Sequence, residues 1–141
     1  MHSKFFYVVG NLWMAPVTVV AWFGVMVSFW LGWIHWGYWY TGRFPFFYLK
    51  PNSWLGRKFP NLRGWAWGPF VVIRSRLPKG IRELTIEHEM RHVEQMMVLS
   101  VFQWILYLVF LCVVGYKKNP FEIDARRTAA RRVEERRRIF G

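Results

Sequence analysis

Residues 85–95 read TIEHEMRHVEQ and contain the pattern H-E-x-x-H as His88, Glu89 and His92. Helix-forming residues dominate from residue 81 to about residue 100, so we expect this stretch to form one helix. Positions i and i+4 share a helix face, which lets the two imidazoles bind one metal ion while Glu89 reaches a water molecule on that ion. The spacing therefore predicts a metal site with Glu89 as catalytic base, and zinc is the ion that suits these ligands.

A third metal ligand is expected on a second helix near the C-terminus. Asn119 and Pro120 are favoured at the N-cap and first positions of a helix, which places Glu122 in its first turn. With Glu122 the ligand set becomes His, His and Glu, the pattern of thermolysin-like enzymes. Alternatively, Glu122 only caps the helix. Asp124 is expected either to orient a ligand histidine or to pair with one of the arginines around it.

A short strand is expected ahead of the H-E-x-x-H helix. Residues 69–74 read PFVVIR, begin at a proline and are rich in β-branched side chains. Prolines and glycines are frequent in residues 43–68, which are therefore predicted to be a basic, Trp-bearing loop. Residues 96–115 form a second apolar run that is just long enough to cross a membrane as a helix.

The composition points to a membrane protein. Of the 141 residues, 54% are hydrophobic and ten are tryptophan, a load that a small soluble domain would struggle to bury. Residues 5–42 carry no formal charge and exceed the roughly 20 residues that a membrane-spanning helix needs. The expected fold is a mainly α membrane protein, with an N-terminal transmembrane helix and a small zincin-like helical core. The alternative to one span is a tight hairpin near Pro16 or Gly24.

The expected organisation has four parts. Residues 1–42 form the membrane anchor, 43–68 the basic loop, 69–130 the zincin-like core with its apolar helix at 96–115, and 131–141 a basic helix end. Four tryptophans at the end of the anchor are expected in an aromatic belt at the membrane interface, or else as a stripe that contacts another helix or a flat cofactor: Trp30, Trp33, Trp36 and Trp39.

The net charge is +12, and we expect the basic residues to contact anionic lipid rather than nucleic acid. In a tethered domain, the C-terminal arginines would meet anionic headgroups: Arg131, Arg132, Arg136 and Arg137. Lysine and arginine favour the cytoplasmic side, so we expect a bacterial cytoplasmic membrane protein whose soluble part is cytoplasmic. Cys112 is the only cysteine, which excludes an internal disulfide and a Cys-rich zinc cage.

Together these features resemble the gluzincins, in particular the HtpX-like bacterial membrane zinc metallopeptidases. The shared frame is a strand and turn, a helix with H-E-x-x-H-x-x-Q, an apolar second helix and a helix that opens with P-x-E-x-x-A, over residues 69 to about 130. The resemblance implies zinc held by His88, His92 and Glu122, with Glu89 as base. It also implies that extended substrate adds to an edge strand, here formed by Phe70, Val71, Val72, Ile73 and Arg74.

The expected function is a membrane-anchored zinc metallopeptidase, or a metallopeptidase-like protein, that hydrolyses peptide bonds at the cytoplasmic membrane face. Tyr107, Tyr116 and Arg126 are candidates for stabilising the oxyanion. The alternative is a non-catalytic accessory subunit of a larger membrane assembly, whose Trp-rich span packs against partner helices or cofactors.

Overall fold

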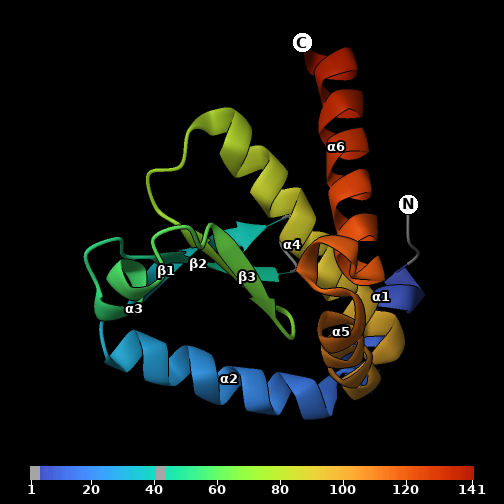
Figure 1. Cartoon of the computed structure of the whole chain (residues 1–141), viewed down its shortest axis with the longest axis horizontal. Helices are drawn as coiled ribbons and strands as arrows, with labels where there is room; N and C mark the ends of the chain where they lie inside the picture. Colours follow the sequence, from blue (N-terminus) through green and yellow to red (C-terminus); the bar gives the residue numbers. More distant parts are fainter. Residues whose placement is uncertain (1–3, 41–43) are drawn as a thin grey trace.

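The computed structural model describes residues 4–40 and 44–141 and contains both helices and strands (Figure 1). The four strands form one mixed sheet in the order β1-β2-β4-β3. The fold is therefore α/β, and the expectation of a mainly α membrane protein with a small helical core is wrong. In chain order the elements are α1 (Lys4–Trp13), α2 (Ala15–Trp30), β1 (Ile34–Tyr40), β2 (Phe44–Leu49), α3 (Trp54–Lys58), β3 (Gly64–Trp67), β4 (Phe70–Arg74), α4 (Lys79–Leu99), α5 (Val101–Val114), the 3-10 turn η1 (Tyr116–Lys118) and α6 (Pro120–Phe140).

The uncharged N-terminal run forms two short helices and a strand instead of a transmembrane helix. Pro16 lies in the first turn of α2, where the missing N–H of proline costs nothing. α2 ends at Trp30, and Gly32 adopts a φ of +67° before the chain enters β1. Within residues 4–40 and 44–141, no single helix combines the length and the apolar composition needed to cross a membrane. α4 and α5 meet those criteria only as a pair, and they are bent by 118° at their junction.

Residues 43–68, expected to be a loop, supply β2, α3 and β3. β2 runs parallel to β4, with Phe46 opposite Val71, while β3 and β4 form an antiparallel hairpin. The predicted strand at residues 69–74 is confirmed as β4, but its predicted position at an edge is wrong. Because β2 and β3 both pair with it, the backbones of Phe70, Val71, Val72, Ile73 and Arg74 lie inside the sheet. The free edge on this side belongs to β3.

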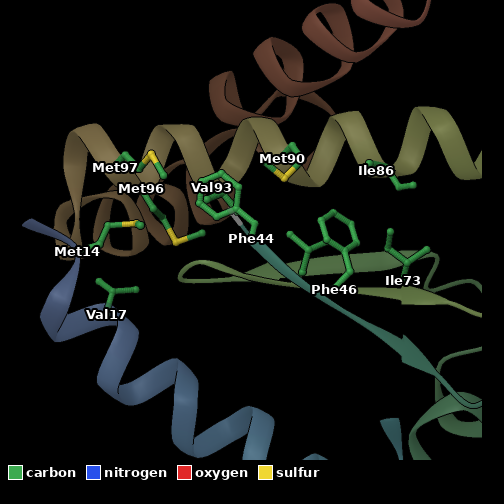
Figure 2. Packing of buried hydrophobic residues seen from close by; sticks show 11 residues of the cluster. Met14, Val17, Phe44, Phe46, Ile73, Ile86, Met90, Val93, Met96 and Met97 are labelled. Atoms are coloured by element: carbon green, nitrogen blue, oxygen red, sulfur yellow. The ribbon is translucent and has the colours of Figure 1, made fainter. Parts of the chain in front are cut away.

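Each face of the sheet packs against a different helix. Figure 2 shows Phe44, Phe46 and Ile73 on one face, pointing toward the side chains of α4, with Met14 and Val17 closing the end of this cluster. The opposite face carries Phe47, Leu49 and Val72, which pack with Val25 of α2. This alternation is the period of two that a sheet buried on both faces requires. The sheet therefore holds α4 rigidly on one side and α2 on the other.

Ion pairs join α6 to α4. Arg132 donates to both carboxylate oxygens of Glu94 at 2.9 Å, and Arg136 binds Glu87. The side chains of Glu87 and Glu94 are 4% and 7% exposed. Arg132 and Arg136 thus neutralise buried acids within the molecule, and their expected role at a membrane interface stays a prediction. Arg131 and Arg137 are exposed.

The four tryptophans do not form a helical stripe, because the chain leaves α2 at the first of them. Trp30 ends α2 and is 84% exposed. Trp33 stacks on Trp54 with ring centroids 5.3 Å apart, and Trp36 lies on β1, edge-on to Phe47. The side chain of Trp39 lies outside the described part of the structure.

Candidate metal site

Two helices bring the three predicted ligands together. His88 and His92 lie one turn apart on α4, and Glu122 lies in the first turn of α6, as predicted. Asn119 caps α6 by accepting the N–H of Phe121 at 3.1 Å, and its own amide donates to the backbone oxygen of Tyr107 at 3.2 Å. The cap fixes the start of α6 and thereby the direction in which Glu122 points.

The three side chains converge on one point. The Nε2 atoms of His88 and His92 are 3.2 Å apart, and each lies 3.2 Å from an oxygen of Glu122. Ligand atoms placed about 2.0 to 2.2 Å from a tetrahedral ion are separated from one another by roughly 3.3 to 3.5 Å. His88, His92 and Glu122 therefore form a group that can hold a metal ion.

The charges of this group favour a cation. Glu122 Oε2 is buried and accepts no hydrogen bond from residues 4–40 and 44–141, although His88 Nε2 lies 3.2 Å away. Burial opposes ionisation of Glu122, but contacts with His88, His92 and Tyr107 hold the pKa of this carboxyl well below its usual range. Burial also opposes charge on His92, yet Glu122 and Glu89 raise the pKa of its imidazole. A buried anion whose two oxygens each lie 3.2 Å from a different imidazole nitrogen fits the donor set of a metal.

Gln95 sets the tautomer of His92. Gln95 Oε1 lies 2.8 Å from His92 Nδ1 and also accepts from Gln103, while Gln95 Nε2 donates to the backbone oxygen of Phe121 and to Asp124. Since Gln95 Oε1 only accepts, Nδ1 of His92 carries the hydrogen, and Nε2 of the neutral ring has a free lone pair. Gln95 lies three residues beyond His92 on the same helix, and that spacing is the only sign of its role in the sequence.

Asp124 is joined to His92 by hydrogen bonds through Gln95. Its Oδ2 accepts from Gln95 at 2.9 Å and from Arg91 at 2.7 Å. Although partial burial opposes ionisation, Arg91 and Gln95 keep the pKa of Asp124 below its usual value. Of the two predicted roles, the ion pair with an arginine is present, and the orientation of the histidine is indirect.

Tyr107 is hydrogen-bonded to the predicted metal ligand Glu122. Its hydroxyl donates to Glu122 Oε1 at 2.7 Å. Burial, together with this contact, raises the pKa of Tyr107, so the hydroxyl stays protonated. Tyr107 and Tyr116 both line the hollow that reaches the ligands, and burial together with Glu122 also raises the pKa of Tyr116, which is half exposed.

Glu89 is buried beside the ligands on the same helix. Burial raises the pKa of Glu89 to about 6, against the opposing charges of His92 and His88 and a hydrogen bond from the backbone N–H of Ala66 on β3. A carboxylate whose pKa lies near neutrality is suited to accept and return a proton. The placement agrees with the base role expected for this residue.

The ligands lie where two hollows meet. One, of about 560 Å³, is lined by polar and charged side chains that include Arg63, His88 and Arg126. The other, of about 340 Å³, is lined by Trp65, Met96 and Trp104 and reaches all three ligands. Glu89, Gly64 and Tyr116 line both. Space for a substrate is therefore open on both sides of Glu89.

The free edge of β3 borders both hollows. Arg74 N–H donates to Arg63 O at 2.7 Å, so the alternation of an antiparallel ladder turns the backbone groups of Gly64 and Ala66 away from β4. Gly64 permits the close approach of β3 to α4, because a Cβ there would lie 2.8 Å from Val72 O and 3.4 Å from Glu89 Cγ. No strand was expected at these residues.

Comparison with models of known protein families, with curated proteins and with solved structures gives no match for this chain.

Proposed function

We propose that this chain is a zinc-dependent peptidase. The observation that carries the proposal is the convergence of His88, His92 and Glu122 on one point, next to a buried carboxylate, Glu89, that lines two open hollows. The resemblance to gluzincins rests on these same residues and agrees with the proposal.

Zinc is the ion that the donor set favours. Two neutral imidazole nitrogens and one carboxylate are the ligands of catalytic zinc sites that keep one position open. When bound, zinc would polarise a substrate carbonyl and make a water molecule more acidic. His88, His92 and Glu122 would hold the ion, Gln95 would fix the ring of His92, and Tyr107 would fix Glu122.

Glu89 is assigned to proton transfer. Its carboxylate would take the proton of the attacking water and pass it to the nitrogen of the departing amine as the peptide C–N bond breaks. The pKa of about 6 leaves Glu89 ionised at neutral pH yet close enough to neutrality to release the proton again.

Tyr116 is the best-placed candidate for a hydrogen-bond donor to the substrate. Burial and the charge of Glu122 raise the pKa of Tyr116 to about 12, so its hydroxyl remains a donor at neutral pH. Arg126 lies 5.8 Å from the centre of the Tyr116 ring and donates to Lys117 O, contacts that hold the phenol at the cleft.

The substrate proposed is an extended peptide segment. The outward backbone groups of Gly64 and the backbone oxygen of Ala66, whose N–H already donates to Glu89, can pair with an added strand, which recognises main chain more than side chains. This assigns to β3 the role first expected for β4.

The decisive experiment separates metal binding from hydrolysis. Elemental analysis of the purified chain should give about one zinc per molecule. Glu89→Gln should keep the zinc and lose about 10²-fold or more of the cleavage rate on a mixed peptide library. Glu122→Gln should weaken zinc binding instead. Glu83→Gln, on the same helix but outside both hollows, is the matched control and should change neither.

Two results would contradict the proposal. A wild-type chain without zinc, or with zinc content unchanged in His88→Ala, would remove the metal site. A chain that binds zinc through these residues but cleaves no peptide in the library, with Glu89→Gln indistinguishable from wild type, would favour the non-catalytic accessory subunit.

A further inference from the structure

An apolar surface covers the corner of the molecule where α1, α2 and α5 meet. Two hydrogen bonds fix this corner: Trp13 Nε1 donates to Val98 O at 3.2 Å, and Ser100 Oγ donates to Trp13 O at 2.8 Å. α2 begins two residues after Trp13, so α1 and α4 end here and α2 and α5 begin here. Large apolar side chains on all three are about half exposed or more, among them Leu12, Trp13, Val20, Phe23, Phe102 and Ile105.

Of the three helices, α5 exposes apolar side chains most extensively. It contains no charged residue, and its one buried residue is the polar Gln103. Apolar side chains are exposed around most of its circumference, including Leu108 at 58% and Val113 at 74%. A helix that is apolar on nearly all sides is normally surrounded by apolar material, and monomers in water rarely leave so large a patch uncovered.

The charged residues on or next to α1 and α5 are all basic, and they lie at the helix ends far from the corner. α1, α2 and α5 contain no Asp or Glu, and the cations near α1 and α5 lie at the ends remote from the corner: Lys4 begins α1, and Lys117 and Lys118 follow α5. The far end of α2 is likewise linked to basic residues. It leads to Trp33, which stacks on Trp54 of α3, and the last turn of α3 carries Arg57 and Lys58.

We propose that this corner inserts into one leaflet of an anionic lipid bilayer, without crossing it, while the lysines at the far ends of α1 and α5 contact headgroups. α5, with 14 residues, is about 21 Å long, and one leaflet offers about 15 Å of hydrocarbon, so the corner can enter while the ends remain at the surface.

A second copy of the chain fits this surface less well. A symmetric dimer through the corner would leave the cations at the far ends of α1 and α5 without acidic partners on these three helices, whereas anionic headgroups would neutralise them. The basic C-terminal end of α6 projects away from α2, on the opposite side of the molecule (Figure 1), so it is not part of the proposed contact.

Vesicle flotation tests the contact directly. The full-length chain should float with vesicles of phosphatidylcholine and phosphatidylglycerol, and less with phosphatidylcholine alone. Phe102→Ser combined with Ile105→Ser should lower the partition coefficient by roughly tenfold or more. Lys117→Gln with Lys118→Gln should lower it by roughly fivefold per lysine, only on anionic vesicles. The matched control is Ile139→Ser with Phe140→Ser, two exposed apolar residues at the far end of α6, and should float as wild type.

Cys112 provides a second readout on the unsubstituted chain. It is the only cysteine, lies on α5 and is exposed. An environment-sensitive fluorophore on Cys112 should shift to the blue when anionic vesicles are added, whereas the same fluorophore on Phe140→Cys, in a Cys112→Ser background, should not.

The outcomes separate the possible occupants of the surface. No shift at Cys112 with vesicles, or equal flotation of the Phe102/Ile105 variant and wild type, would overturn the proposal. A blue shift without vesicles that grows with protein concentration would assign the corner to a second copy and would also overturn it. With zinc removed from both proteins by a chelator, Glu122→Gln should float like wild type, so the result does not depend on whether the metal site hydrolyses peptides.

Discussion

Tyr107 donates its hydroxyl hydrogen to Glu122 Oε1 across 2.7 Å and so joins α5 to the first turn of α6. Removing this hydroxyl in Tyr107→Phe should weaken zinc binding by about 10-fold to 100-fold, since Glu122 loses a partner that orients it. Leu108→Ala, an exposed change on the same helix that lines neither hollow, is the control and should alter neither zinc affinity nor the rate of peptide hydrolysis. Competition with a chromophoric chelator measures the zinc affinity, and cleavage of the peptide library measures the rate. Equal zinc affinity in wild type and Tyr107→Phe would refute the positioning role.

Gln95→Ala should weaken zinc binding by a similar factor, although Gln95 is not itself a metal ligand. The substitution leaves Nδ1 of His92 without its acceptor, so the ring loses both its tautomer preference and its orientation. Val98→Ala, an exposed position on the same helix, is the control. Calorimetric titration with zinc should show the loss for Gln95→Ala alone, and a loss of equal size at Val98 would point to a general effect on α4.

Glu89→Gln should stabilise the metal-free protein at neutral pH. The pKa of Glu89 is raised by burial to about 6, so the folded state holds this proton more tightly than the unfolded state does. The wild-type chain therefore loses stability as the pH rises from about 4 to about 6, and Gln does not titrate. The variant should be more stable by about 2 kcal/mol at pH 7, with little difference near pH 4. Chemical denaturation of chelator-treated protein at both pH values checks this, and an advantage that persisted at pH 4 would contradict the stated cause.

Gly64→Ala should lower hydrolysis while leaving zinc bound. The added Cβ would lie 2.8 Å from Val72 O and 3.1 Å from Thr85 Cγ2, so β3 must shift relative to α4, whereas the ligands lie on α4 and α6. We expect a destabilisation of about 1–3 kcal/mol and a larger change in KM than in zinc content. Gly80→Ala, where a Cβ meets only one atom of Arg137 at 3.7 Å, should be neutral or slightly stabilising. Full activity in Gly64→Ala would show that the edge of β3 does not bind substrate.

Two neighbouring arginines should differ sharply in their contribution to stability. Arg132→Ala removes a partner of two buried acids, Glu87 and Glu94, and should cost about 2 kcal/mol. Arg131→Ala removes a 3.9 Å contact between exposed groups and should change the free energy of unfolding by less than about 0.5 kcal/mol. Urea denaturation of both variants measures the difference, and similar values would mean that the α4–α6 ion pairs contribute little.

The metal ligands could be predicted from the sequence because the pattern that carries them is local. His88 and His92 share a face on any helix, and the Asn119–Pro120 start of α6 fixes the turn that holds Glu122. What remained open was whether the two helices meet. Their contact depends on Arg132 and Arg136 reaching buried acids on α4, and no spacing in the sequence shows such a pairing.

Only β4 could be recognised from the sequence, because β1 resembles a membrane segment in composition and β2 and β3 lie in a stretch rich in proline and glycine. Residues 34–40 read IHWGYWY and 44–49 read FPFFYL, and aromatic residues are favoured both in strands and at membrane interfaces. Phe44 and Phe46 alternate with Phe47 and Leu49 between two buried faces, so an uncharged run here reflects burial by α4 on one side and α2 on the other. The free edge of β3 follows from the order of strands, which depends on long-range pairing.

α5 has two faces with different contacts, so zinc binding at one face and bilayer binding at the other are energetically linked. Tyr107, on its inner side, holds Glu122, while its outer side carries the apolar residues proposed to enter lipid. A helix moves as one body, so any shift of α5 produced by the bilayer also moves the hydroxyl that orients the ligand. If docking changes the zinc affinity by some factor, zinc must change the affinity for the bilayer by the same factor, because the free energy around a closed thermodynamic cycle is zero.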